Sequence, residues 1–138
     1  MSQNSSLNIL IADDEADLLE IIADVLSDNH NVTMVKNGAE AWRKISRSPR
    51  EFDLVISDVS MPILDGVGLL KRIKHDLPHI GVIMVSGVAD AETAVQCIKR
   101  GAYDYLSKPF RRLEDIEEMV EAWILEEKIP GRDAEPSF

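Results

Sequence analysis

Residues 54–58 read LVISD, and this short stretch decides the fold class. The hydrophobic run from Leu54 to Ser57 has the length of a buried strand, and it ends directly at Asp58. In open α/β folds, ligands bind at the carboxyl ends of parallel strands. The stretch therefore predicts a buried strand that places a carboxylate at the ligand-binding edge of a sheet.

The same arrangement recurs at three other places along the chain. Each has polar residues just past the end of a short hydrophobic run: Asp13-Asp14 after residues 7–12, Ser86 after residues 80–85, and Lys108-Pro109 after Tyr105-Leu106. If these strands run parallel, all of the polar groups lie at one edge of one sheet. The sequence therefore predicts a single site.

Apolar runs alternate with amphipathic stretches of about ten to fifteen residues, the pattern of repeated β-α units. The predicted strands are 7–12, 32–35, 54–57, 80–85 and 104–106. The predicted helices carry apolar residues at helical spacing: Leu18, Ile22 and Val25; Ala41, Trp42 and Ile45; Leu70, Ile73 and Leu77; Ala91, Ala94, Val95 and Ile98; and Leu113, Ile116, Val120 and Trp123. This alternation predicts an α/β fold with a parallel sheet.

The composition is acidic. Lys and Arg total 15 against 25 Asp and Glu, a formal net charge of −10 over 138 residues. A chain of this length suits one domain with its own core. Because an acidic surface repels a phosphate backbone, we expect no direct binding of nucleic acid, and cations and proteins are the expected partners.

Other features indicate a cytoplasmic chain. The start, MSQNSSLN, has no basic region followed by an apolar one, and no apolar run approaches the roughly 20 residues that span a bilayer. We therefore expect a soluble protein without membrane contact. The single cysteine, Cys97, is expected to be buried. The histidines His30, His75 and His79 are expected to be exposed polar residues rather than phosphodonors.

Carboxylates that converge at a sheet edge repel one another unless a cation lies between them. Mg²⁺ prefers carboxylate oxygens, so Asp13, Asp14 and Asp58 would suit it if the first and third strands are neighbours. A lone Asp13-Asp14 pair would be better explained as a helix N-cap. The matching Asp58 makes Mg²⁺ the favoured interpretation.

Lys108 and Ser86 add an ammonium and a hydroxyl to the same predicted edge. Together with carboxylates and a metal they suit transfer of a phosphoryl group onto a carboxylate, because the metal and the lysine offset charge on the equatorial oxygens. Asp58 is the expected acceptor. Taken alone, Lys108 would be a surface charge and Ser86 a helix cap, so the functional interpretation depends on the coincidence of all four positions.

The segments ILIADDE, LVISDVSMPILDGVGLL, VIMVSG and GAYDYLSKPF resemble those of bacterial response-regulator receiver domains, in the same order and with similar spacings. The resemblance implies a doubly wound, flavodoxin-like sheet of five parallel strands in the order 2-1-3-4-5, with helices on both faces, the order found in a chemotaxis receiver. It predicts a receiver domain over residues 5–129 and a flexible tail or linker stub over 130–138.

The resemblance also assigns metal ligands. Asp58 would be the phosphoacceptor, and Asp13 and Asp14 would hold Mg²⁺ together with it. The main-chain carbonyl of Ser60 would complete the protein ligands.

Other roles concern the phosphoryl group and the switch. Ser86 and Lys108 would contact the phosphoryl group, and the Lys108–Pro109 peptide is expected to be cis. Tyr105 matches the aromatic residue that moves inward when the hydroxyl of Ser86 moves toward the phosphate. From the residues alone, Tyr105 would be a half-buried strand residue.

The implied function is that of a phosphorylation-activated switch in a two-component system. A sensor histidine kinase or a phosphotransfer protein would supply the phosphoryl group, and the surface of the fourth helix, fifth strand and fifth helix would change its arrangement. That surface, which includes Arg111 and Arg112, would bind a downstream protein or fused output domain and could form a homodimer. The chain would catalyse only its own phosphotransfer and autodephosphorylation, so it is not expected to be an enzyme.

Other functions fit the sequence less well. A hydrolase of the haloacid-dehalogenase type needs a second acid two residues beyond the nucleophile, where this chain has Ser60. A flavodoxin needs a phosphate loop after the first strand, where this chain has the acids 13–15, and the Gly66-x-Gly68 sequence lacks the third glycine of a dinucleotide site. A receiver-fold scaffold that no longer accepts phosphate stays open as the alternative, although its site residues are all present.

Overall fold

The computed structural model describes residues 6–87 and 91–128, and the predicted tail at 130–138 lies outside this range. Five strands form one sheet: β1 (Asn8–Ala12), β2 (Asn31–Val35), β3 (Leu54–Asp58), β4 (Gly81–Ser86) and β5 (Asp104–Ser107). Every neighbouring pair is parallel, and the order is β2-β1-β3-β4-β5. The predicted fold class and strand order are confirmed.

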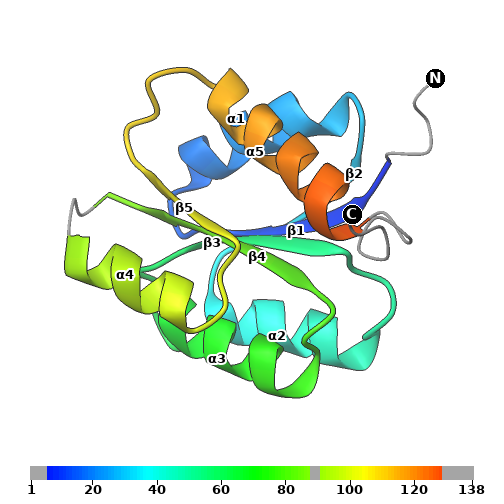
Figure 1. Ribbon diagram of the computed structural model, residues 1–138, viewed down its shortest axis with the longest axis vertical. Coiled ribbons are helices and arrows are strands. Elements are labelled where there is room, and N and C mark those ends of the chain that lie inside the picture. The colour runs from blue at the N-terminus through cyan, green and yellow to red at the C-terminus, as the bar shows by residue number, and fades with distance from the viewer. Residues whose placement is uncertain (1–5, 88–90, 129–138) are drawn as a thin grey trace, which may run out of the picture.

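Helices cover both faces of the sheet (Figure 1). On one face lie α1 (Ala16–Ser27) and α5 (Glu114–Trp123), which continues into the π-helical segment η2 (Ile124–Lys128). On the other lie α2 (Gly38–Arg47), α3 (Gly66–Asp76) and α4 (Ala91–Lys99). Within the ranges that the structure describes, no helix combines the length and apolar character needed to cross a bilayer.

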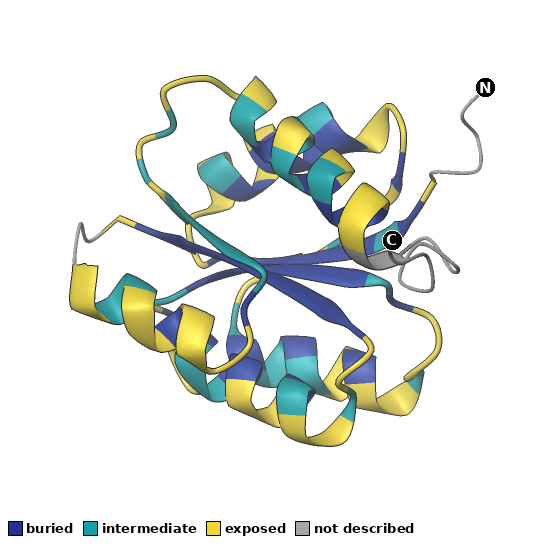
Figure 2. Ribbon diagram, in the orientation of Figure 1, coloured by how far each residue is buried: buried dark blue, intermediate teal, exposed yellow. Residues whose placement is uncertain are grey.

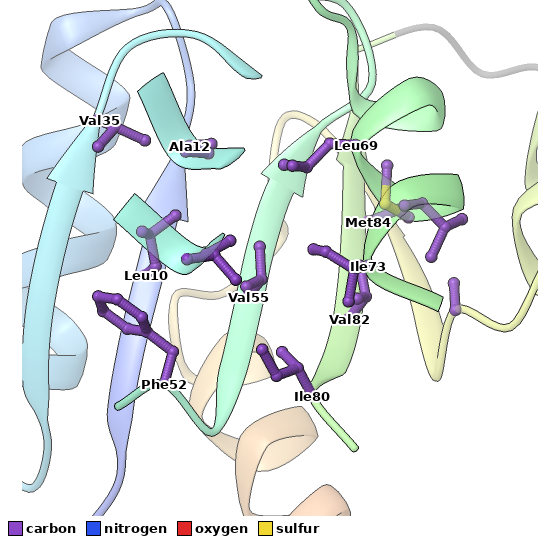
Figure 3. Packing of buried hydrophobic residues seen from close by; sticks show 14 of the residues in the cluster. Leu10, Ala12, Val35, Phe52, Val55, Leu69, Ile73, Ile80, Val82 and Met84 are labelled. Atoms are coloured by element: carbon purple, nitrogen blue, oxygen red, sulfur yellow. The ribbon is translucent and has the colours of Figure 1, made fainter. Parts of the chain in front are cut away.

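The core consists of two layers because successive strand residues point to opposite faces of the sheet. Leu10, Val55 and Val82 face α2 and α3, where Ile73 and Phe52 pack against them (Figure 3). The alternate strand residues face α1 and α5: Ile9, Ile11, Leu54, Ile56, Ile83 and Val85. All residues of β3 and β4 are buried, as expected for central strands of a covered parallel sheet (Figure 2).

The prediction for the fourth helix was wrong about which residues face the core. Val95 and Ile98 are 50% and 47% exposed, whereas Cys97 is fully buried. Since α4 packs beside the edge strand β5, it contacts little of the sheet, and one inward residue suffices (Figure 1). The predicted burial of Cys97 is confirmed.

Smaller corrections concern the helices of the other face. In α1, the buried residues are Leu19, Ile22, Ala23 and Leu26, and the predicted Leu18 and Val25 are only half-buried. The helix is therefore rotated by about one position relative to the predicted stripe. Leu113 is 41% exposed because it precedes α5 as its N-cap residue.

His30 is buried, contrary to the prediction, whereas His75 and His79 are exposed. His30 lies between α1 and β2, and its Nδ1 accepts a hydrogen bond from the backbone N–H of Leu7 at 3.1 Å. Burial lowers the pKa of His30, an effect that Glu121 and Glu117 partly oppose. The ring therefore serves as a neutral acceptor that holds the chain ahead of β1.

We expect the protein to lose stability in mild acid through His30. Its folded-state pKa lies below the ordinary value of 6.5, so the unfolded chain binds more protons and stability falls as pH decreases through that value. Protonation also removes the acceptor of the Leu7 N–H, and a buried donor left without its partner costs about 1–3 kcal/mol, which is the loss that we expect. Urea unfolding at pH 7.5 and 5.5 should show a larger decrease for the wild type than for His30→Gln. Identical pH dependences would contradict this role.

Candidate functional site

The predicted site residues converge where the strands end. Asp13 follows β1 and Asp58 ends β3, and these strands are neighbours. Carboxylate oxygens of Asp13, Asp14 and Asp58 all lie within 4.8 Å of one another. Asp13 and Asp58 are buried, and Asp14 is exposed. The arrangement therefore offers three converging oxygens, the donor type that Mg²⁺ prefers, with one side open to solvent.

Asp58 is held by backbone contacts on both sides of its strand end. The hydroxyl of Ser57 donates a hydrogen bond to the Asp58 carbonyl at 2.9 Å. The next residue, Val59, donates its N–H to Val85 of β4 and accepts the N–H of Gly66 at the start of α3. These bonds fix where the chain leaves the sheet, and hence where the Asp58 side chain begins.

The electrostatic environment of Asp58 disfavours its charged form. Burial raises the pKa of this carboxyl, and the neighbouring Asp13 carboxylate raises it further. Lys108 and the backbone N–H of Ser60 oppose the shift. An added cation would therefore stabilise the carboxylate form.

Lys108 is the positive group of the site. Its Nζ lies 2.8 Å from Glu15 Oε1, 3.1 Å from Asp13 Oδ2 and 3.3 Å from Asp58 Oδ2. Burial alone would lower the pKa of Lys108, but the carboxylates outweigh it and the pKa is raised. Lys108 thus stays protonated, and the Lys108–Pro109 peptide is cis, as predicted.

Ser86 and Ser60 lie at the same edge, whereas Tyr105 lies on β5 opposite Met84, two residues before the end of β4. Ser86 ends β4, is buried, and accepts the backbone N–H of Lys108 at its carbonyl. Ser60 lines a cavity together with Asp14 and Asp58. Tyr105 is half-buried on β5 and packs against the core on the α2 and α3 side.

An open cavity of about 1050 Å³ gives access to the site. Asp58 and Lys108 line it, so a reacting group can approach the carboxylate from solvent. One rim is apolar and consists of residues from α1 and from the segment after β5: Leu18, Ile21, Pro109, Phe110 and Leu113. The exposed fractions of Ile21 and Leu113, 43% and 41%, leave this rim available to a protein surface.

The sequence interpretation missed Glu15. It occupies the N-cap position of α1, yet its side chain makes no capping hydrogen bond and instead contacts Lys108. The signal was present, because Glu15 is the third acid of the run after the first strand and shares its sheet edge with Lys108.

The fold and the site define a flavodoxin-like α/β domain whose sheet edge carries acidic residues around one lysine. A family model, the response regulator receiver domain, matches residues 9–121. The chain belongs to this family, whose members act in two-component signalling.

Two relatives of known sequence are longer than this chain. It is 42% identical over 113 residues to the 3',5'-cyclic-nucleotide phosphodiesterase regA of Dictyostelium discoideum, covering 78% of this chain and 14% of regA. It is 39% identical over 106 residues to the nitrogen assimilation regulatory protein NtrX of Azorhizobium caulinodans, covering 75% of this chain and 23% of that protein. The chain therefore spans less than a quarter of the length of either relative.

Solved structures of receiver domains share the fold. A receiver domain protein from Clostridium thermocellum superposes with a TM-score of 0.82 at 32% identity, over 88% of this chain and 97% of that one. The receiver domain of NtrX from Brucella abortus gives a TM-score of 0.72 at 39% identity, over 82% and 98%. The likeness thus covers nearly the whole of two separately solved receiver domains.

Proposed function

We propose that this chain is a phosphorylation-activated switch in which Asp58 accepts the phosphoryl group. The observation that carries the proposal is the convergence of the Asp13, Asp14 and Asp58 carboxylates beside an open cavity, with Asp13 and Asp58 in contact with the ammonium of Lys108. Two features support Asp58 as the nucleophile: it lines the cavity, and its backbone is fixed on both sides. The unit with this function would extend over residues 5–129, followed by a tail or linker stub at 130–138.

The acidic cluster fits Mg²⁺. Asp13, Asp14 and Asp58 would hold the ion through carboxylate oxygens, and Ser60 would add its main-chain carbonyl. When bound, Mg²⁺ offsets negative charge on the oxygens of the transferring group. Lys108 contributes a second positive charge, directed at the same carboxylate by its contact with Asp58.

The phosphoryl donor would be a phosphohistidine of a sensor histidine kinase or of a phosphotransfer protein. An oxygen of Asp58 attacks phosphorus, the P–N bond to the imidazole breaks, and the imidazole leaves with the electron pair. The apolar rim around Ile21 and Leu113 would bind the donor protein next to the cavity. The chain would catalyse only this transfer and its own dephosphorylation.

The new charge would then be detected by Ser86 and Tyr105. A phosphoryl group adds about one further negative charge and three acceptor oxygens, and the hydroxyl of Ser86, the last residue of β4, would bond one of them. Tyr105 would follow on β5, and the surface of α4, β5 and α5 would change its arrangement. Arg111 and Arg112 are exposed beside it.

The partners of this surface would be proteins. A downstream protein, a fused output domain or a second copy of the chain would bind it, and a cytoplasmic location fits a kinase-driven switch. A net charge of −10 disfavours direct contact with nucleic acid.

Incubation with acetyl phosphate and Mg²⁺ tests the proposal. We expect intact mass spectrometry to show a gain of one phosphoryl group in the wild type and none in Asp58→Asn, because the amide cannot act as the nucleophile. Chelation of the metal with EDTA should abolish the gain. Asp53→Asn is the matched control, since Asp53 lies on the chain just before β3 and away from the cavity.

The alternative is a scaffold that keeps the fold but accepts no phosphate. An unmodified wild-type mass under these conditions, with the protein folded by circular dichroism, would favour the scaffold. A gain that persists in Asp58→Asn would assign the acceptor to another residue.

A further inference from the structure

All three donors of the Lys108 ammonium are engaged. A lysine ammonium has three N–H donors and no acceptor, and three carboxylates lie within ion-pair distance of Nζ, those of Glu15, Asp13 and Asp58. The contact with Glu15 is the shortest, at 2.8 Å. A phosphoryl oxygen that binds Lys108 must therefore displace one of them.

Glu15 is the carboxylate that can leave. The side chain of Asp13 is only 2% exposed, and its Oδ1 is also held by the backbone N–H of Glu15. Asp58 itself carries the phosphoryl group in the proposed function. The side chain of Glu15 is 62% exposed, so it can turn into solvent and be hydrated at little cost.

We propose that Glu15 is a positioning residue that holds Lys108 in the unphosphorylated state and competes with the phosphoryl group for its ammonium. This inference rests on the proposed function of Asp58. The side chain of Glu15 contacts Lys108 and does not cap α1, although Glu15 occupies the N-cap position, where a shorter side chain would cap the helix. The consequence is that Glu15 weakens binding of any phosphoryl-like group at Asp58.

Beryllofluoride, an analogue of the phosphoryl group, provides the test because its binding is an equilibrium. In Mg²⁺ and fluoride, NMR titration with beryllium should show that Glu15→Gln binds about two- to fivefold more tightly than the wild type, the range expected for a partly exposed ion pair. Added salt should reduce this ratio, because it screens the ion pair in the wild type. A purely structural effect of Glu15→Gln would not depend on salt in this way.

Asp17→Asn is the matched control. Asp17 lines the same cavity and is also exposed, so Asn removes the same unit charge without removing a contact to Lys108. We expect its affinity to change less than that of Glu15→Gln. In a structure of the wild-type beryllofluoride complex, Glu15 should lie more than about 4 Å from Lys108, the limit of an ion pair.

The outcomes separate this inference from the proposed function. If the wild type binds beryllofluoride and Glu15→Gln binds it no more tightly than Asp17→Asn, the role of Glu15 is overturned and the phosphoacceptor role of Asp58 stands. A Glu15–Lys108 contact that persists in the beryllofluoride complex would likewise overturn the role of Glu15 and leave that of Asp58 standing. Failure of the wild type both to bind beryllofluoride and to take up a phosphoryl group would remove both proposals.

Discussion

The free energy of unfolding of Lys108→Met should be about 3 kcal/mol lower than that of the wild type in metal-free buffer at neutral pH. The side chains of Asp13 and Asp58 are 2% and 7% exposed, and Lys108 is the cation that contacts both. Removing one partner of a buried ion pair leaves an uncompensated charge and costs about 3–5 kcal/mol. Burial and Asp13 raise the pKa of Asp58, and the loss of Lys108 removes a group that opposes this shift, so Asp58 binds a proton more readily and relieves part of the cost. We therefore expect a loss near the lower limit of that range.

Mg²⁺ should restore much of the lost stability of Lys108→Met. An ion that binds only the folded state at a concentration about 100-fold above its dissociation constant contributes about 2.7 kcal/mol. Urea unfolding with EDTA and with Mg²⁺ measures both effects. Lys71→Met is the control, because Lys71 is an exposed residue of α3 and its loss should change stability by less than about 0.5 kcal/mol.

Equal stabilities of Lys108→Met and the wild type without metal would show that Lys108 does not compensate the acidic cluster. A loss that Mg²⁺ leaves unchanged would contradict the proposed cation site. The two parts of the prediction therefore test the lysine and the metal separately.

The central fold was predictable because its signals are local and redundant. Strands β3 and β4 are buried throughout and mostly apolar, and each ends at a polar residue, Asp58 or Ser86. The strand order was not predictable from these patterns alone, since nothing in a single apolar run specifies its neighbours. It came from the resemblance to receiver domains, and the observed β2-β1-β3-β4-β5 order agrees with it.

The errors arose where tertiary contacts decide burial. An apolar residue in a helix is counted as core by its spacing, but Val95 and Ile98 are exposed because α4 covers only a sheet edge. His30 is buried because the Leu7 N–H, 23 residues away in the sequence, needs an acceptor. A hydrogen bond to a backbone group so far away in the sequence leaves no local signal.

The aspartates and the lysine of the site were predicted, but the ion pair between Glu15 and Lys108 was not. Asp13, Asp58 and Lys108 were predicted because each is a polar residue at the end of a strand or directly after it. The contact between Glu15 and Lys108 joins residues 93 positions apart and depends on the direction of a long side chain. The loop after β3 contains a second feature without a sequence signal, Ile63 with a φ of 72°, a backbone conformation that costs a residue other than glycine about 1–2 kcal/mol.

Gly66→Ala should destabilise the protein by about 3 kcal/mol, the upper end of the usual cost of overpacking. A Cβ at Gly66 would overlap the backbone carbonyl oxygen of Asp58 and come within 2.9 Å of Met84 Cε. The carbonyl belongs to a central strand, so α3 must move relative to β3, and the Gly66 N–H bond to Val59 would be strained. Because the displaced backbone carries Asp58, phosphorylation by acetyl phosphate should also become slower.

The sign of this effect separates packing from helix propensity. Alanine is favoured over glycine within a helix by up to about 1 kcal/mol, so propensity alone predicts that Gly66→Ala stabilises α3. Gly68→Ala is the matched control in the same helix, since the nearest atom to its Cβ is Leu64 Cδ1 at 2.8 Å, the end of a flexible side chain that can turn away. Urea unfolding should therefore show a large loss for Gly66→Ala and little change for Gly68→Ala. Equal stabilities of the two variants would mean that β3 and α3 can separate at low cost, and that the position of Asp58 is not fixed by this close approach.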